Sequence, residues 1–299
     1  MTRKSFLQAS GATIASAILS PLLGADEAPK KKRQLKKAVN LEMATAPRAS
    51  VTDRFKMIQD AGFDGVEVNR PDATHLDEII KARDLTSLPI AGVIDSVHWG
   101  KPLSSPDPKV REQGFNGLKL ALKEAGELGC ERLLLVPAVV NREVSYADAY
   151  TRSQALIKQA VPFAEAAKCR IAVENVWNQF LLSPLEAARY LDEIDSPWVG
   201  WHFDIGNVVN TGWPEQWLRI LGPRVLNLHI KEFSRKKRDD SGLWKGFDVE
   251  LGEGDVEWPA VMQALDAIDY HGWGILEVGG GNAARLKFLA QRTDKIFAG

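Results

Sequence analysis

Cysteine is scarce in this chain: it occurs twice in 299 residues, which excludes a disulfide scaffold. Cys130 and Cys169 each come just before a predicted strand. If those strands are neighbours in the sheet, both thiols lie at the same end of it and can form a disulfide in an oxidising compartment. Two inert buried thiols are the simpler alternative, and the sequence favours it.

An excess of charge of either sign is also absent. The chain has 38 Lys and Arg against 39 Asp and Glu, for a formal net charge of -1. Neither a nucleic acid nor an acidic membrane surface is therefore an expected partner. The basic run at residues 29–36 contains no aromatic residue, and such a run is typical of a solvated linker rather than of a nucleic-acid site.

A hydrophobic run long enough for a comfortable transmembrane helix is missing too. Arg3 and Lys4 precede an uncharged run of apolar and small residues from Ala9 to Leu23, which is the layout of a secretory signal. Residues 1–28 are therefore predicted to be a cleavable export signal, cut after Ala25. It resembles a twin-arginine signal in which a lysine replaces the second arginine.

This signal predicts an exported protein, periplasmic or otherwise extracytoplasmic, with no stable membrane span after cleavage. The protein would be cytoplasmic if the signal does not function. A retained membrane anchor is the alternative to cleavage.

From residue 37 onward, short apolar runs alternate with longer amphipathic ones, as in an α/β protein. The predicted strands are 38–43, 65–68, 89–97, 132–137, 171–174, 198–204, 225–231 and 274–278. The predicted helices are 51–61, 75–84, 107–128, 146–167, one beginning at Ser183-Pro184, 255–268 and 282–297. Near-continuous apolar strands with these connections predict a single (β/α)₈ TIM barrel over residues 37–299. A doubly wound open sheet is the runner-up, but it predicts a glycine-rich turn after the first strand, and residues 42–45 contain no glycine.

Four of the predicted strands end on side chains that commonly bind metals. They are Glu174, Asp204, His229 and Glu277. Functional groups of such a barrel lie at the carboxyl ends of the strands, and a lone charge is costly to bury there, so we expect the four to meet at one mouth. Carboxylates with one imidazole suit one divalent ion, Mn²⁺, Mg²⁺ or Co²⁺, with Zn²⁺ as the alternative. Taken singly, each acid is equally well explained by a helix cap or an ion pair.

Side-chain alternation adds further polar groups to this mouth. Glu42, Glu67 and His98 are predicted to end the first three strands, and Lys231 shares a face with His229. Polar groups from at least seven strands would then converge. Several tryptophans near strand ends either stack on sugar faces or pack in the core and rim; they are Trp99, Trp177, Trp201 and Trp213.

Five motifs resemble, in this order, those of the sugar phosphate isomerase/epimerase family with the xylose isomerase-like TIM barrel. They are Val173-Glu174-Asn175, Phe203-Asp204-Ile205-Gly206-Asn207, Leu228-His229-Ile230-Lys231-Glu232, Leu251-Gly252-Glu253-Gly254 and Ile275-Leu276-Glu277. The likeness covers about residues 37–299. It is greatest to the L-ribulose and L-xylulose 5-phosphate 3-epimerases, followed by the ketose 3-epimerases of the tagatose type.

The resemblance implies a divalent-metal-dependent sugar isomerase or epimerase that acts on a ketose or keto-sugar. Glu174, Asp204, His229 and Glu277 would be the metal ligands. Glu174 and Glu277 would also transfer protons on opposite faces of the sugar, through a metal-stabilised enediolate. The partner would be a small-molecule sugar, and the sequence leaves the oligomeric state open, a homo-oligomer included.

Four more residues are assigned to substrate binding: His98, Lys231, Glu67 and Asn207. The resemblance makes His98 a partner of substrate hydroxyls, with a hydrogen-bonded core histidine as the alternative. Lys231 would hold a hydroxyl or a phosphate, or else pair with Glu67 or Glu232. Asn207 stands where the tagatose-type enzymes have a histidine. Because phosphorylated sugars are mainly cytoplasmic, the export signal favours an unphosphorylated ketose or keto-sugar derivative.

Other functions use a similar set of ligands. A dehydratase or lyase of a keto-sugar or keto-inositol would remove the same acidified proton and expel hydroxide, and hydroxypyruvate isomerase is another relative. An endonuclease IV-like nuclease would need several zinc ions, a basic face and more histidines than the five present. A non-catalytic, exported sugar-binding barrel is the third class.

Overall fold

The computed structural model describes residues 35–72 and 74–298. The predicted export signal at residues 1–28 and most of the basic linker at 29–36 lie outside the described residues. Within the described ranges, no helix combines the length and the apolar character that crossing a membrane requires.

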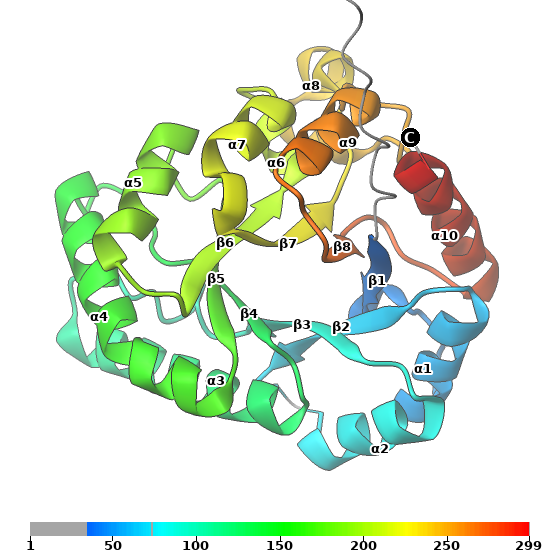
Figure 1. Cartoon of the computed structure of the whole chain (residues 1–299), viewed down its shortest axis with the longest axis horizontal. Helices are drawn as coiled ribbons and strands as arrows, with labels where there is room; N and C mark the ends of the chain where they lie inside the picture. The colour runs from blue at the N-terminus through cyan, green and yellow to red at the C-terminus, as the bar shows by residue number, and fades with distance from the viewer. Residues whose placement is uncertain (1–34, 73, 299) are drawn as a thin grey trace, which may run out of the picture. The chain divides into compact units, whose positions relative to one another are not determined.

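Eight parallel strands of the described chain form a closed barrel (Figure 1). They are β1 (Lys36–Asn40), β2 (Gly65–Arg70), β3 (Ile90–Asp95), β4 (Arg132–Leu135), β5 (Arg170–Glu174), β6 (Val199–Asp204), β7 (Val225–Ile230) and β8 (Trp273–Leu276). Each strand pairs with the next along the chain, and β1 closes the barrel on β8. The predicted α/β class and single (β/α)₈ TIM barrel are confirmed.

Helices surround the strands and connect them in order (Figure 1). The longer ones are α1 (Val51–Asp60), α2 (Leu76–Thr86), α3 (Pro108–Glu127), α4 (Tyr146–Ala167), α5 (Pro184–Ile194), α7 (Pro214–Leu221), α9 (Trp258–Ala267) and α10 (Ala283–Ala298). The shorter elements are η1 (Leu41–Met43), α6 (Ile205–Val209), η2 (Gly222–Arg224), α8 (Arg235–Ser241) and η3 (Leu243–Phe247). Three of these short elements follow the carboxyl end of a strand. η1 directly continues β1 and α6 directly continues β6, while α8 begins a few residues after β7.

The helix ends follow from the local sequence. The Ser50 hydroxyl accepts a hydrogen bond from the Asp53 backbone N–H, and the Asp53 carboxylate accepts one from the Ser50 N–H, so α1 begins with a reciprocal cap. Ser183 caps α5 in a similar way. Gly62 and Gly129 follow α1 and α3 with φ of +94° and +68°, a left-handed conformation that glycine adopts without steric cost. The predicted starts and stops of these helices are confirmed.

Some details of the predicted fold are wrong. The first strand ends at Asn40 rather than at Met43, because the Asn40 side chain accepts a hydrogen bond from the Glu42 N–H and turns the chain into η1. The sequence pattern also gives no helix between β6 and β7, where the structure has α6 and α7. The signal for α7 is Pro214, which is its first residue.

Polar side chains occupy the barrel interior above an apolar plug. Most buried apolar side chains lie between the strands and the helices. A separate small cluster consists of Ala38, Ala91, Trp273 and Ile275. Ala38 and Ile275 lie two residues before Asn40 and Glu277, so they point to the same face one layer deeper. The strand ends are thus free to carry polar groups.

The two cysteines are buried free thiols. Cys130 precedes β4 and Cys169 precedes β5. The two strands pair with each other, with Arg132 opposite Arg170, so they are neighbours in the sheet. Burial raises the pKa of both thiols and keeps them in the unreactive protonated form. The structure matches the expectation of two inert thiols.

Candidate active site

Four side chains meet at the carboxyl end of the barrel, as the sequence predicts. Glu174 and Asp204 are the last residues of β5 and β6, His229 is the fifth residue of β7, and Glu277 directly follows β8. One ligand atom from each lies within 4.8 Å of the others. Asp204 pairs with His229 in the β6–β7 register, so their side chains share a face and a level. The sheet register therefore builds the cluster.

His229 lies at the centre of this cluster. Its Nδ1 is 3.0 Å from Glu174 Oε1, 3.4 Å from Glu277 Oε2 and 4.0 Å from Asp204 Oδ2. Its Nε2 faces the other way and is 3.3 Å from both carboxylate oxygens of Glu67. A histidine that ligates a metal usually gives its second ring nitrogen to a carboxylate or a carbonyl, which fixes its tautomer. Glu67 therefore holds the Nε2–H and leaves Nδ1 for the mouth.

The four residues fit a single divalent ion. Ligand atoms about 2.0–2.1 Å from an octahedral ion stand about 3 Å from their neighbours, which is close to the spacing of His229 Nδ1 and Glu174 Oε1. Three carboxylates and one imidazole are donors that hard and borderline ions accept. With Glu67, four carboxylates surround a neutral, ligating His229 and the ammonium of Lys231, so a divalent ion together with Lys231 would offset three of the four buried negative charges.

Burial and mutual charge set the pKa values in the cluster. Burial raises the pKa of Glu174 to about 7 and that of Asp204 to about 6, partly offset by nearby cationic groups. Burial acts in the same direction at Glu277, but His229 and a neighbouring lysine outweigh it and hold the pKa of Glu277 well below its usual range. Burial lowers the pKa of His229, yet the carboxylates, Glu67 first, outweigh it and hold that pKa well above its usual range. The pKa values of Glu174 and Glu277 are thus shifted in opposite directions.

Lys231 directly follows β7 and reaches into the cluster. Its Nζ donates to Glu277 Oε2 at 2.6 Å and to Asp204 Oδ2 at 3.3 Å. The alternative that Lys231 pairs with Glu67 or Glu232 is wrong, because Glu67 lies a layer deeper and Glu232, the next residue, points to the opposite face. Burial lowers the pKa of Lys231, but Asp204 and Glu277 outweigh it and raise that pKa. The ammonium therefore stays charged at the mouth.

Glu67 lies inside the barrel rather than at its mouth. It is 0% exposed and is the third residue of β2, which continues to Arg70, so its predicted place at the end of the strand is wrong. Asn40 Nδ2 donates to Glu67 Oε2 at 3.1 Å, and both Glu67 oxygens face His229. A Cβ on Gly92 would lie 3.0 Å from Glu67 Oε1, so a glycine there leaves room for the carboxylate. Glu67 supports His229 from beneath.

His202 and Asn227 lie in the same interior layer, paired in the β6–β7 register. The His202 ring packs edge-on against His229, with ring centroids 4.1 Å apart. Among the described groups, His202 Nε2 and Asn227 Oδ1 are buried without a hydrogen-bond partner. Burial lowers the pKa of His202 well below its usual range, so a neutral imidazole packs beneath His229.

Asn175 joins the ends of β5 and β6. Its Nδ2 donates to Asp204 O at 2.8 Å, and its Oδ1 accepts from the Asp204 N–H and from Trp201 Nε1, both at 3.0 Å. Asn207 Nδ2 donates to Asn175 O at 3.1 Å, and the Asn207 N–H donates to Asp204 Oδ1 at 2.8 Å. The Asn207 amide, predicted to bind substrate, is thus bonded to the site's own backbone. Asn175 was given no role by the sequence pattern, and its position directly after Glu174 is the signal that identifies it.

His98 lies in the turn after β3, which ends at Asp95, so its predicted place at the end of the third strand is wrong; it is 4% exposed. Its Nδ1 accepts a hydrogen bond from the Val136 N–H at 3.3 Å, and its ring meets Trp99 edge-on with centroids 5.5 Å apart. Burial lowers the pKa of His98 to about 3, so the imidazole is neutral and carries its hydrogen on Nε2. The Nδ1 bond is what the core-histidine alternative expects, while Nε2–H is the donor available to a substrate.

Glu42 does not reach the mouth. Its side chain on η1 is 62% exposed and pairs with Arg54 at 3.2 Å. The predicted convergence of Glu42 with the strand-end groups is therefore wrong, because β1 ends before Glu42 and the turn carries it outward.

A groove of about 850 Å³ opens on the cluster beside β7 and β8. Its lining includes Lys231 and Glu277 of the cluster, and Trp244 and Phe247 of η3. Trp244 is a residue that the sequence pattern missed, because it lies far from any strand end. The lining contains more acidic than basic side chains. Through Glu277, this groove connects the solvent with the candidate metal ligands.

The tryptophans singled out by the sequence pattern lie elsewhere. Trp201 is a fully buried core residue, and Trp99 and Trp213 are each 53% exposed outside the lining of the groove. Trp177 packs against Trp244, with ring centroids 4.9 Å apart. The expectation of packing in the core or rim holds for Trp201, and Trp177 supports the groove from behind.

Glu232 fixes the loop at residues 250–256, which contains the Leu-Gly-Glu-Gly motif. It is 2% exposed, and its carboxylate accepts from Trp258 Nε1 and from the Gly252 N–H, both at 2.8 Å. A Cβ on Gly254 would lie 2.5 Å from Glu232 Oε1, so only glycine passes this carboxylate. The two neighbouring sequence motifs are thus parts of one hydrogen-bonded unit that holds a wall of the groove.

Replacing Glu232 with Gln is expected to lower the free energy of unfolding by about 1–3 kcal/mol, because at least one buried N–H loses its acceptor. Urea unfolding followed by tryptophan fluorescence measures the change. Glu253→Gln, the same replacement on a side chain of the same loop that is 56% exposed, is the control and should change the stability by less than about 0.5 kcal/mol. An equal loss in both variants would contradict the anchoring role of Glu232.

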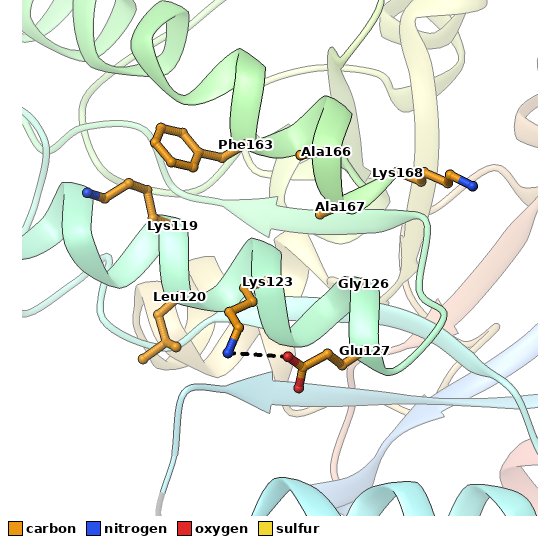
Figure 2. A pocket seen from close by; sticks show the side chains of 9 residues that line it. All are labelled: Lys119, Leu120, Lys123, Gly126, Glu127, Phe163, Ala166, Ala167 and Lys168. Atoms are coloured by element: carbon orange, nitrogen blue, oxygen red, sulfur yellow. Dashed lines mark ion pairs between the residues drawn. The ribbon is translucent and has the colours of Figure 1, made fainter.

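A second groove lies on the outside of the barrel, between α3 and α4 (Figure 2). It measures about 740 Å³ and is lined by Lys119, Leu120, Lys123, Gly126, Glu127, Phe163, Ala166, Ala167 and Lys168. Gly126 and Ala167 lie at the carboxyl ends of their helices, which face the amino ends of the strands, away from the catalytic mouth of such barrels. Its carboxylate, Glu127, pairs with Lys123 at 3.3 Å. This outer groove has no histidine in its lining and does not resemble an active site.

Known proteins share both this sequence pattern and this fold. Residues 55–293 match the family described as the xylose isomerase-like TIM barrel. L-ribulose-5-phosphate 3-epimerase UlaE of Salmonella paratyphi A is 25% identical over 240 residues, which cover 76% of this chain and 81% of that protein.

Solved structures superpose on most of the chain. A structure of L-ribulose 3-epimerase has a TM-score of 0.74 at 18% identity, covering 89% of this chain and 95% of that chain. The 3-keto-D-glucoside 4-epimerase YcjR from E. coli has a TM-score of 0.71 at 15% identity, covering 89% and 100%. At these identities the two structures show the shared fold alone.

The resemblance predicted from the five motifs is confirmed, and so is the predicted enzyme class, an isomerase. The family match extends from α1 into α10 and includes every candidate ligand. The chain belongs to the xylose isomerase-like TIM barrel family.

Proposed function

We propose that the chain is a divalent-metal-dependent epimerase or isomerase of an unphosphorylated ketose or keto-sugar. The observation that carries the proposal is the meeting of Glu174, Asp204, His229 and Glu277 at the carboxyl end of the barrel, with ligand atoms within 4.8 Å of one another. These four would hold the ion, with Mn²⁺, Mg²⁺ or Co²⁺ preferred to Zn²⁺ for this donor set. Two of the three relatives are named as 3-epimerases and the third as a 4-epimerase, and these names support the same class of reaction.

When bound, the ion would supply the positive charge that acidifies a C–H beside a carbonyl and stabilises the resulting enediolate. The proton transfers belong to Glu174 and Glu277. They come from β5 and from the end of β8, with β6 and β7 between them in the barrel, so their carboxylates approach a bound sugar from different sides. Return of a proton to the opposite face gives epimerisation, and return to the neighbouring carbon gives isomerisation.

Lys231 assists this pair from the groove side. Its Nζ, 2.6 Å from Glu277 Oε2, holds Glu277 in the ionised form that a base requires. The same ammonium faces the groove and can donate a hydrogen bond to a substrate oxygen. His98, through Nε2–H, and Asn207 are proposed as substrate contacts, and Glu67 acts instead through His229.

The charge of the groove supports an unphosphorylated substrate. Five acidic and three basic side chains line it. The basic ones already have partners: Lys231 bonds to Glu277, Lys237 to the Asp248 carbonyl, and Arg285 to both oxygens of Glu250 at 2.9 and 2.8 Å. Phosphate sites use clusters of available Arg and Lys donors. A phosphate monoester would have to displace these partners, two of which are carboxylates, whereas a neutral sugar would not.

We also place the protein outside the cytoplasm, on the strength of the signal pattern at residues 1–28, which is followed by the basic linker. N-terminal sequencing of the mature protein tests this part. We expect a new N-terminus directly after Ala25, and an intact Met1 in the exported fraction would contradict it.

Two measurements test the catalytic proposal. Elemental analysis of the native protein should find about one divalent ion per chain; several zinc ions would favour the nuclease alternative, and no metal would contradict the proposed site. Incubation with ketoses in deuterium oxide should place deuterium on the carbon beside the carbonyl. Exchange with loss of water would indicate the dehydratase or lyase, and metal without exchange into any ketose or keto-sugar would indicate a binding protein.

A further inference from the structure

The groove that opens on Glu277 is larger than one monosaccharide needs. Its volume of about 850 Å³ is in the upper part of the range of roughly 300–1,000 Å³ in which proteins bind drug-sized ligands. A free pentose or hexose is smaller than such a ligand, and its reacting carbons must lie beside Glu277. The groove therefore has room for a second ring next to the reacting one.

An aromatic wall lines this additional space. Trp244 is 69% exposed, and its ring packs on Trp177 with centroids 4.9 Å apart. Phe247 packs on Trp177 at 5.0 Å and edge-on against Phe233 at 4.9 Å. Trp244 is thus the exposed edge of a continuous aromatic cluster rather than an isolated surface residue. An exposed aromatic ring that is fixed from behind in this way offers a face on which a ligand ring can pack.

The aromatic wall is held rigidly beside the candidate ligands. The Ser234 N–H donates to Gly246 O at 2.7 Å, and a Cβ on Gly246 would lie 2.3 Å from the Phe233 ring, so η3 sits directly on that ring. Lys231 Nζ lies 5.0 Å from the centroid of the Phe247 ring and also bonds to Glu277. The wall is therefore preorganised and continuous with the reacting end of the groove.

Polar groups around the same space define the chemistry of its occupant. Asp248, Glu250 and Glu253 line the groove together with Arg285. Carboxylates accept hydrogen bonds from hydroxyls, and an aromatic face packs against the C–H face of a sugar ring. An anion would be repelled by these acids, and a purely apolar ligand would cover their charged oxygens without donating a hydrogen bond to them. A neutral, polyhydroxylated ring satisfies both walls.

We infer that the substrate is a neutral glycoside, in which the keto-sugar unit that reacts at Glu277 is joined by a glycosidic bond to a second sugar ring stacked on Trp244. The identity of the reacting unit rests on the proposed function. The second-ring subsite rests on the groove alone and is measurable by binding, without catalysis.

The test compares D-fructose with lactulose and isomaltulose, two disaccharides in which a second sugar is joined to a fructose unit with a free anomeric carbon. Isothermal titration of the full chain with Mn²⁺ present gives each dissociation constant. At least one disaccharide should bind about tenfold tighter than fructose, the size expected for one well-packed ring contact. In Trp244→Ala this ratio should fall to about one, and Trp244→Phe should restore part of it.

Trp213→Ala is the matched control, because Trp213 is 53% exposed and lies outside the lining of the groove. It should keep the wild-type ratio, and circular dichroism should show that all variants are folded. Equal affinities for fructose and both disaccharides, no measurable disaccharide binding, or a ratio unchanged in Trp244→Ala would each overturn the subsite. A preference for a disaccharide without deuterium exchange would support the second-ring subsite and contradict the proposed function. Deuterium exchange into fructose without that preference would support the proposed function and contradict the subsite.

Discussion

Glu277→Gln is expected to lower deuterium exchange into a ketose substrate by about 10²–10⁴-fold, the usual contribution of a general acid or base. In the proposed mechanism Glu277 accepts the proton, and His229 and Lys231, which outweigh burial and hold the pKa of Glu277 well below its usual range, keep it ionised for that role. An amide cannot take the proton. The replacement has the same shape, and the side chain is 42% exposed, so the fold should be unaffected. Exchange rates by NMR or mass spectrometry give the result.

The metal content of the same Glu277→Gln sample separates two causes of lost exchange. Gln keeps one oxygen ligand, so partial occupancy with no exchange would assign the loss to proton transfer, whereas an empty site would assign it to metal binding. Glu253→Gln is the control, because Glu253 lines the same groove, is 56% exposed and pairs with Arg292 rather than with the cluster. If Glu277→Gln exchanges at the wild-type rate, Glu277 is not part of the acid/base pair.

The meeting of the four candidate ligands could be predicted from the sequence because of one geometric fact about barrels. All eight strands run parallel, so whatever ends a strand arrives at the same mouth. Glu174 and Asp204 end their strands, and a parallel register brings Asp204 beside His229. Hydrophobic periodicity and helix caps were enough to locate the strands and the helices that flank them. Ser183 and Gly129, for example, mark a helix start and a helix end through local backbone conformations that need no tertiary partner.

The depth of each polar group could not be predicted in this way. Glu67 stands in an apolar run and looks like a strand end, yet β2 continues through Asn69 to Arg70, and the β2–β3 register shifts between Val66 and Glu67. Whether such a residue faces the mouth or lies beneath it depends on the stagger of neighbouring strands, which a single sequence does not contain. The partners of Lys231 were missed for the same reason.

The aromatic wall was missed because its contacts are far apart in the chain. Trp244 and Phe247 lie in a short helical turn between β7 and α9, and they pack on Trp177 after β5. No local periodicity marks a side chain whose position is set by a ring some 70 residues earlier, as the sequence numbers show. The residues that reach the groove come from connecting segments, which is where barrels vary their specificity.

Asp204→Asn is expected to weaken Mn²⁺ binding by at least about 100-fold, the upper end of the loss seen when only a supporting side chain of a metal site is removed. Asp204 is 0% exposed and contributes Oδ2 to the cluster, 4.0 Å from His229 Nδ1. Asn keeps the shape but removes the negative charge that a divalent ion requires. Titration calorimetry of the metal-free protein with Mn²⁺ measures the affinity, and the metal-dependent rise in melting temperature checks it independently.

The Asn variant should fold normally, since the backbone and helix-cap contacts that place residue 204 do not depend on its charge, and Lys231 keeps its shorter bond to Glu277 when the Asp204 carboxylate is lost. Asn175 bonds to the backbone N–H and C=O of Asp204, and the oxygen that caps α6 by accepting from the Asn207 N–H is present in both side chains. Asp248→Asn, the same replacement on a groove side chain that is 59% exposed, is the control and should bind Mn²⁺ like the wild type. If Asp204→Asn also binds Mn²⁺ like the wild type, the four strand-end residues are not the ligand set. The carboxylates around His229 would then serve only as ion-pair partners of His229 and Lys231.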